Sequence, residues 1–151
     1  MSQRLDYVHE APAGLRALGS VHTYVANSGL PRELVDLVYL RVSQINGCAY
    51  CVAEHSRDLR QGGMPIEKLV LVSAWRESGD VFTAQERAAL RWAESLTLVA
   101  QTGAPDEDYQ EALEQFDSKA LVDLTIAIGL MNTYNRIAIG FRRAPEVRPA
   151  A

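Results

Sequence analysis

The segment NGCAYCVAEH, residues 46–55, organises this chain of 151 residues. It contains both cysteines of the sequence, Cys48 and Cys51, and one of its three histidines, His55. In an α-helix, side chains separated by three or four positions lie on the same face. The segment therefore predicts a helix that presents two thiols and an imidazole side by side, which indicates redox or metal chemistry.

Outward from this segment, hydrophobic spacing predicts helices along the rest of the chain. Gly47 is expected to end one helix immediately before the next begins, because glycine tolerates left-handed backbone angles. Residues 1–11 are expected to be partly irregular, and Ser118 to cap a long, mostly apolar last helix. The predicted helices cover residues 12–27, 31–46, 48–61, 65–77 and 83–101, and two more begin at 105 and 118.

These segments, with no convincing pair of strands, predict an all-α fold. The length suits one domain. We therefore expect residues 1–151 to form a single-domain bundle of about six to seven helices, with the core motif region at about 31–64.

Composition and charge exclude several classes of protein. The net charge of −4 and scattered basic residues argue against a nucleic-acid partner. No apolar run reaches the roughly 18–20 residues that span a bilayer, and the N-terminus lacks the apolar core of a secretory signal. A cytoplasmic location is the resulting prediction. Because that compartment is reducing, the Cys-x-x-Cys pair is expected to be catalytic or metal-binding rather than purely structural.

The predicted position of the cysteines at the N-terminus of a helix favours their thiolate form. Cys48 and Cys51 fall at the start of a helix, where free amides and the helix dipole stabilise a thiolate. His55 lies one turn beyond Cys51 and can take or hold its proton. We predict that Cys51 attacks an oxidant and that Cys48, the more exposed thiol, resolves the sulfenic acid and meets the reductant.

Two other readings of the cysteines remain open. The thiols could simply pack in a core, since free cysteine is often buried. Alternatively, Cys48, Cys51 and His55 could bind a metal, with Asp36, Glu54 or water as the fourth ligand. No second pair of ligands closes such a site, so we expect neither a metal nor an organic cofactor. A thioredoxin-like fold is excluded because it requires βαβ units.

Residues 40–55, LRVSQINGCAYCVAEH, resemble the core of the carboxymuconolactone decarboxylase superfamily, in its alkylhydroperoxidase D-like (AhpD-like) branch. Weaker similarity extends through residues 91–94 and 131–136. The resemblance implies an AhpD-like all-α fold, trimers or hexamers, and peroxidase or disulfide chemistry. It also implies that Cys51 is the peroxidatic thiol, Cys48 its partner and His55 the associated histidine.

The chain departs from the family pattern at two positions. The family has a proton-relay glutamate twelve residues before the first cysteine, where this chain has Asp36. Glu33, one turn earlier, is the alternative relay, and we expect Asp36 to serve. The family's peroxidases have a histidine between the cysteines, where this chain has Tyr50, which could line the pocket. Arg41 and Asn46 could support the motif through hydrogen bonds.

The leading functional prediction is an antioxidant thiol peroxidase that reduces hydroperoxides. Its electrons would come from a dithiol protein, either lipoyl-bearing or thioredoxin-like. One alternative is a non-catalytic thiol sensor or scaffold. Another is a carboxymuconolactone decarboxylase-type enzyme, a branch that lacks the two-cysteine site. The apolar last helix also predicts a homo-oligomer, because it has more apolar surface than one small bundle needs to bury.

Overall fold

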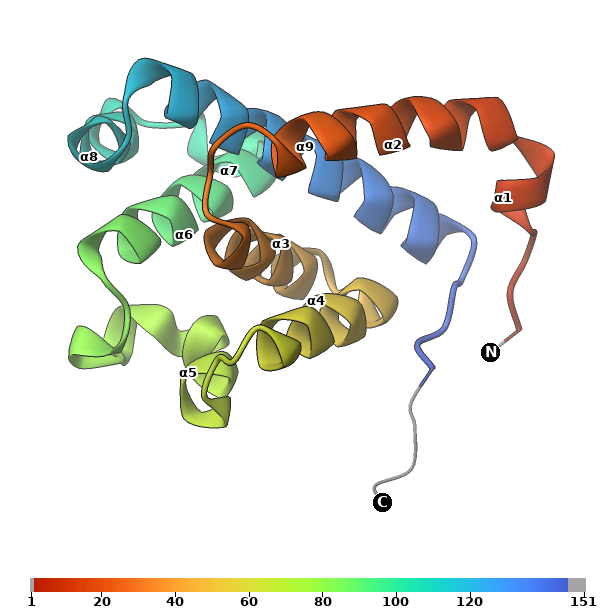
Figure 1. The fold of residues 1–151 in the computed structure, drawn as a ribbon, viewed down its shortest axis with the longest axis horizontal. Coiled ribbons are helices and arrows are strands. Elements are labelled where there is room, and N and C mark those ends of the chain that lie inside the picture. The colour runs from red at the N-terminus through yellow and green to blue at the C-terminus, as the bar shows by residue number, and fades with distance from the viewer. Residues whose placement is uncertain (1, 147–151) are drawn as a thin grey trace.

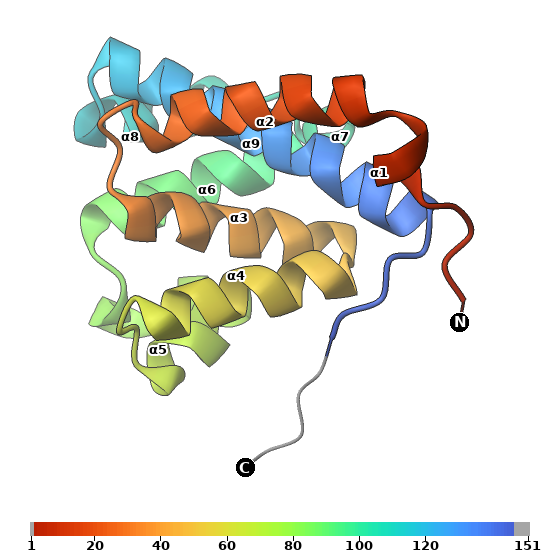
Figure 2. The same cartoon turned by 45° about the vertical axis from the view of Figure 1, so that its right-hand side comes forward.

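Helix α3 (Arg32–Asn46) lies at the centre of the fold. It packs against α4 (Ala49–Gln61), α6 (Ala84–Thr97) and α9 (Ser118–Gly140), as Figures 1 and 2 show. Its buried side chains lie on more than one face of the helix. A helix that is apolar on several faces is stable only in the interior, so the helix that precedes the cysteines also anchors the fold.

The computed structural model describes residues 2–146, and within that range it contains helices and no strands. This confirms the predicted all-α class. No described helix is both long enough and apolar enough to cross a membrane. The remaining elements are α1 (Tyr7–Glu10), α2 (Pro12–Ala26), α5 (Ile66–Leu71), the 3₁₀-helices η1 (Val72–Glu77) and η2 (Gly79–Val81), α7 (Val99–Thr102) and α8 (Asp106–Gln115).

The turn between α3 and α4 is a single left-handed residue. Gly47 has φ 71° and ψ 30°, and its amide donates to the carbonyl of Gln44. The amide of Cys48 then donates to the carbonyl of Ser43 at 3.0 Å. This left-handed cap, which glycine adopts without strain, reverses the chain so that α4 runs back along α3.

Two hydrophobic clusters meet on α3. One cluster includes Val38 and Val42 together with the cysteines and apolar side chains of α6 and α9. The other includes Leu37 and Leu40 and lies toward α5 and η1. Because α3 contributes to both clusters, the cysteines at the start of α4 pack against a helix that is itself fixed in the core.

The N-terminal stretch is partly irregular, as predicted: within residues 2–11 only residues 7–10 form a helix, α1, because the Asp6 side chain accepts hydrogen bonds from the amides of Val8 and His9. Two predicted helix boundaries were wrong. The predicted helix over 65–77 changes to 3₁₀ geometry after Leu71. The predicted helix over 83–101 breaks at Leu98, which has φ −101° and ψ 28°.

The start of the last helix also differs from the prediction. Asp117, and not Ser118, caps α9, and its carboxylate accepts from the amide of Ala120 at 2.8 Å. Ser118 is instead the first helical residue. Both residue types favour caps, so the sequence offered two adjacent candidates.

Candidate active site

The two cysteines occupy the first turn of α4, where the sequence places them. They are joined in a disulfide, and Cys48 is the N-cap residue of the helix. The amide of Cys51 donates to Sγ of Cys48 at 3.3 Å. Sulfur therefore occupies the position where free helix amides stabilise negative charge.

Both cysteines are buried, and the expectation that Cys48 is the more exposed was wrong. Cys48 is 1% exposed and Cys51 is 5% exposed. Both cysteines belong to the hydrophobic cluster formed with α6 and α9, and Cys51 also lines a cavity that Cys48 does not line. A molecule in that cavity would meet Cys51 and not Cys48.

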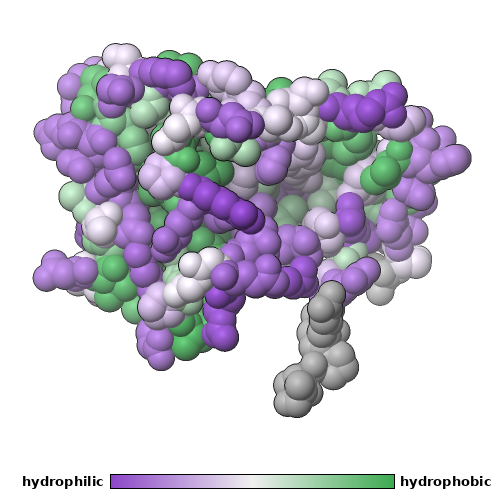
Figure 3. Space-filling model, in the orientation of Figure 1, coloured by the Kyte–Doolittle hydropathy of each residue, from purple (hydrophilic) through white to green (hydrophobic). Residues whose placement is uncertain are grey.

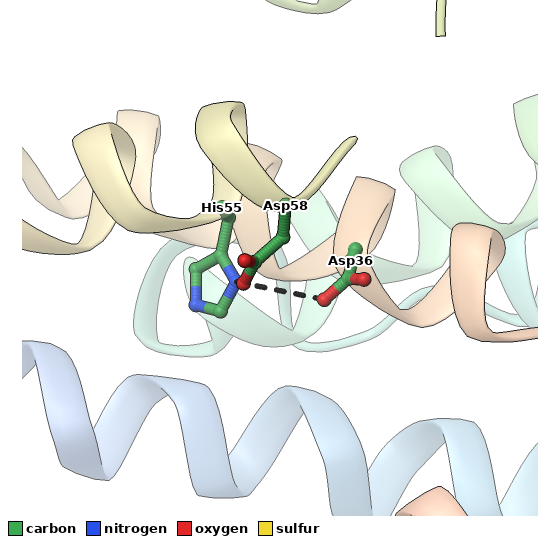
Figure 4. Close-up of side chains that lie close together, drawn as sticks. All are labelled: Asp36, His55 and Asp58. Atoms are coloured by element: carbon green, nitrogen blue, oxygen red, sulfur yellow. Dashed lines mark ion pairs between the residues drawn. The ribbon is translucent and has the colours of Figure 1, made fainter. Parts of the chain in front are cut away.

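His55 lies one helical turn beyond Cys51 and lines the same cavity. Its Nδ1 lies 3.6 Å from Oδ1 of Asp36 on α3 and 3.9 Å from Oδ2 of Asp58 on its own helix (Figure 4). Both distances exceed hydrogen-bond length, and this buried nitrogen has no hydrogen-bond partner. The imidazole is therefore beside two carboxylates without being bound to either.

The structure brings Asp36, and not Glu33, next to His55. Asp36 also lies 3.6 Å from Nε of Arg32, an exposed side chain one turn earlier. Glu33 is exposed and makes no described contact with His55. Of the two candidate relay acids, Asp36 alone has its carboxylate facing the imidazole.

Sequence reasoning missed two neighbours of His55. The ring of Tyr39 lies 5.1 Å from the His55 ring, centroid to centroid, at 58°. Tyr39 is 1% exposed, and its hydroxyl has no hydrogen-bond partner. Burial, and then the charge of Asp36, raise the pKa of this phenol well above its usual value. Helical spacing could have found both residues, since Tyr39 follows Asp36 by three positions and Asp58 follows His55 by three.

The cavity beside Cys51 has a volume of about 410 Å³ and a mainly apolar lining. It lies between the N-terminal helices, α4 and the end of α9, and Figure 3 shows the surface hollowed beneath α2. Volumes of this size are typical of small-molecule sites. Tyr50 contributes to its wall, with the guanidinium of Arg143 4.0 Å from the centre of its ring.

His55 also lines another cavity, of about 500 Å³. That cavity is lined by Asp36 and Tyr39 but by neither cysteine. His22, His55 and Asp58 line both cavities, so the imidazole lies where the cavity beside Cys51 meets the one that includes Asp36.

Asn46 and Arg41 brace the helices around the motif. Nδ2 of Asn46 donates to Oδ1 of Asn132 and of Asn135 at 3.0 and 2.9 Å, which ties α3 to α9. Arg41 donates to Glu94 on α6 at 2.8 Å. Neither side chain has a described hydrogen bond to the cysteines or to His55, so both position helices.

Glu94 is the centre of a fully paired cluster. Besides Arg41, its carboxylate accepts from Nε1 of Trp75 and from Arg76, both at 2.7 Å. Burial would raise the pKa of Glu94, but the hydrogen bonds from Trp75, Arg76 and Arg41 outweigh it and hold the pKa below its usual value. The carboxylate is therefore a fixed anion at neutral pH.

The candidate metal ligands differ from the trio considered from spacing. Within residues 2–146, Asp36, His55 and Asp58 place one possible ligand atom each within 4.8 Å of one another. The cysteines are joined to each other in this structure and do not belong to the group. A cation bound to these three side chains would be coordinated by Nδ1 of His55, the nitrogen that faces Asp36.

Comparison with known proteins identifies relatives over most of the chain. The sequence profile of the Carboxymuconolactone decarboxylase family matches residues 10–95. YdfG of Bacillus subtilis, an uncharacterized protein, is 37% identical over 139 residues, which are 92% of this chain and 94% of that protein. YnjA of Escherichia coli, also uncharacterized, is 34% identical over 74% of this chain and 64% of its own length.

Solved structures confirm the fold. A protein of unknown function from Agrobacterium tumefaciens, provisionally assigned as the antioxidant defence protein AhpD, is 40% identical with a TM-score of 0.94, covering 97% of this chain and 100% of that one. The alkylhydroperoxidase AhpD core of a peroxidase-related protein from Ralstonia eutropha is 20% identical with a TM-score of 0.80, covering 92% and 74% of the two chains. At that lower identity the likeness shows the fold alone.

Proposed function

Because the chain belongs to the carboxymuconolactone decarboxylase family, in its AhpD-like branch, we propose that it is a thiol peroxidase acting through Cys51 and Cys48. One observation supports this assignment above the others. Cys51 lines a cavity large enough for a small organic molecule. Its disulfide partner Cys48 is buried and does not line that cavity, and His55 lies one helical turn from Cys51.

The first step is attack by the Cys51 thiolate on one peroxide oxygen. An S–O bond forms, the O–O bond breaks, and the leaving alkoxide takes a proton to become an alcohol. Cys51 is then a sulfenic acid. Cys48 attacks this sulfur, a disulfide forms, and the oxygen leaves as water.

A dithiol must then reduce the disulfide. Two electrons pass from the dithiol, which becomes a disulfide, and Cys48 and Cys51 return to thiols. A lipoyl-bearing or thioredoxin-like protein supplies this chemistry. Both cysteines are buried when joined, so the reductant attacks from the cavity, where Cys51 is the sulfur within reach.

His55 handles the protons of both steps. Its Nδ1 faces Asp36 and Asp58, which leaves Nε2 to exchange protons within the cavity. Asp36 orients the ring and stabilises its protonated form. Because Nδ1 has no hydrogen bond in this oxidised state, the ring is free to form a closer contact with Asp36 when it is charged.

Turnover with a small dithiol donor tests this proposal. Wild-type protein should consume organic hydroperoxide continuously in the presence of dihydrolipoamide, and thiol titration after one equivalent of peroxide should show the loss of two thiols. A sensor or scaffold would oxidise once and not turn over. Release of carbon dioxide from a carboxymuconolactone with no peroxide consumption would instead support the decarboxylase alternative.

The proposed enzyme is a cytoplasmic homo-oligomer, a trimer or hexamer. Apolar side chains remain exposed on α9, including Val122, which is 58% exposed. Apolar surface of this kind is favourably buried between subunits. Light scattering coupled to size exclusion tests this, and a monomer at micromolar concentration would contradict it.

A further inference from the structure

The cavity beside Cys51 continues into a more polar one. The second cavity, of about 600 Å³, lies between the N-terminal segment and the segment after α9. The two share the side chains Tyr7, Val8, Tyr50 and Arg143. A ligand longer than the first cavity would therefore pass Arg143 on its way from Cys51 toward solvent.

The first cavity suits a hydrocarbon group. Its walls include Leu15 of α2 and Met131 and Ile137 of α9. Hydrogen peroxide gains nothing from such a lining, whereas an alkyl chain gains roughly 25 cal/mol for each Å² of apolar surface removed from water. The shape and chemistry of this cavity therefore favour an organic hydroperoxide with a sizeable apolar part.

Arg143 is a cation at the boundary that forms no ion pair within the described chain. Its Nη1 donates to the hydroxyl of Tyr7 at 2.9 Å, and its guanidinium lies over the Tyr50 ring. Among residues 2–146 no carboxylate forms an ion pair with it. A guanidinium has five N–H donors in a planar fork, so most of its donors remain for a ligand.

Two acids also line the first cavity. Glu54 accepts from Arg57 at 2.7 Å, and its charge also acts on Arg143 from a distance greater than that of an ion pair. Asp58 lies 3.9 Å from Nδ1 of His55. Tyr7 and Tyr50 hold Arg143 in place, and a carboxylate matches an edge of a guanidinium with two parallel hydrogen bonds.

We propose that the physiological substrate is an amphipathic hydroperoxide, an apolar carbon chain that carries a carboxylate. The carboxylate binds Arg143 and the chain lies along the apolar wall, which places the peroxide at Cys51. This inference rests on the proposed peroxidase function and uses the same reaction, in which Cys51 takes one oxygen and the acid leaves as its hydroxy derivative. Arg143 is then a specificity-determining residue.

A matched pair of substrates tests the inference. Linoleic acid hydroperoxide and its methyl ester differ in charge but have the same chain and the same reactive group. With wild-type protein, kcat/KM for the acid should exceed that for the ester by about tenfold or more, the range of a charge-assisted hydrogen bond. Equal values for acid and ester would overturn the inference while leaving the peroxidase function intact.

Two substitutions at Arg143 test whether this residue causes the preference for the acid over the ester. Arg143→Gln should bring the ratio of acid to ester close to one, and Arg143→Lys should restore part of it. Arg142→Gln is the matched control, since Arg142 is exposed and lines neither cavity, and it should retain the wild-type ratio. A full preference for the acid in Arg143→Gln would refute the role of this residue.

Two further measurements keep the inference testable whatever the variants do. In wild-type protein, KM for the acid should rise with added salt while KM for the ester stays constant, and parallel behaviour would count against a carboxylate site. Calorimetric titration with linoleic acid itself measures binding without chemistry. Binding that requires Arg143, with no turnover of any hydroperoxide, would support the carboxylate site and overturn the peroxidase proposal.

Discussion

Two carboxylates at the central helix differ in how they are paired: Asp36 belongs to α3, and Glu94 of α6 accepts from Arg41 of α3. Glu94 accepts hydrogen bonds of 2.7 to 2.8 Å from Arg41, Trp75 and Arg76. Asp36 has only looser neighbours, with His55 and Arg32 each 3.6 Å away. The first group is completely paired, and the second is half-buried without a hydrogen bond to either neighbour.

The difference is one of hydrogen bonding: the Glu94 cluster is fully paired, and the cluster around His55, the proposed proton carrier, is not. Buried polar groups in folded proteins are nearly always hydrogen-bonded, because an unpaired one is unfavourable by about 1–3 kcal/mol. Around His55 the chain leaves both Nδ1 and the Tyr39 hydroxyl unpaired. Among the described residues the third buried polar atom without a partner is Oγ of Ser95 on α6. The unpaired Nδ1 is compatible with the proton exchange proposed for His55.

The largest effect is expected from Cys51→Ser, which removes the proposed nucleophile beside the His55 cluster. A serine hydroxyl is not ionised at neutral pH, so peroxide consumption should fall by about a thousandfold or more. Stopped-flow peroxide assays measure the loss. The comparison variant Cys48→Ser should consume one equivalent and leave a sulfenic acid on Cys51 that dimedone traps. Trapping on Cys48 in Cys51→Ser would reverse the assignment.

Asp36→Asn is expected to lower kcat by about ten- to a hundredfold, because it removes the negative charge that stabilises protonated His55. The thermal midpoint should change little, since Asp36 has no short hydrogen bond to lose. Glu33→Gln is the control and should retain activity within about twofold, as exposed residues usually do. If Glu33→Gln loses activity and Asp36→Asn does not, Glu33 is the relay acid.

Glu94→Gln should lower the stability of the fold and leave the catalytic rate unchanged. It leaves Arg41 and Arg76 facing a neutral amide in a half-buried site, and the free energy of unfolding should fall by about 2 kcal/mol. Urea unfolding measures the change, and kcat of the folded fraction should stay near that of the wild type. A variant of unchanged stability would show that complete pairing at Glu94 does not stabilise the fold.

The same cluster predicts a dependence on pH. Burial would raise the pKa of Glu94, but hydrogen bonds to the charged form lower it below the ordinary value of 4.5. Its stabilisation is therefore complete above pH 4.5 and is lost as the pH falls through the lower pKa of the folded state. The difference in unfolding free energy between wild type and Glu94→Gln should shrink between pH 5 and the acid transition.

Tyr39→Phe is expected to have the smallest effect, and of the opposite sign. It removes a buried hydroxyl that has no partner, so stability should stay the same or rise by up to about 1 kcal/mol. Thermal unfolding of both proteins measures this. A loss of more than about 1 kcal/mol would mean that the hydroxyl has a partner in solution, and that the contrast with Glu94 is smaller than the structure indicates.

Much of the site was predictable because its geometry is local. The positions of Cys48, Cys51 and His55 follow from helical spacing, and the turn at Gly47 from the backbone freedom of glycine. Tyr39 and Asp58 follow the same spacing and could have been included. The break at Leu98 and the 3₁₀ segment after Leu71 were missed, because packing overrides the local preferences that pattern reasoning uses.

Local interactions within the chain were sufficient to specify the helices, the cap at Gly47 and the grouping of two thiols with an imidazole. Distant contacts were needed for the rest. Cys48 is buried because α6 and α9 cover it, and Arg143 meets Tyr50 because the chain after α9 returns to the start of α4. Helical geometry depends on neighbours within four residues, whereas burial and charge pairing depend on whichever segments the folded chain brings together.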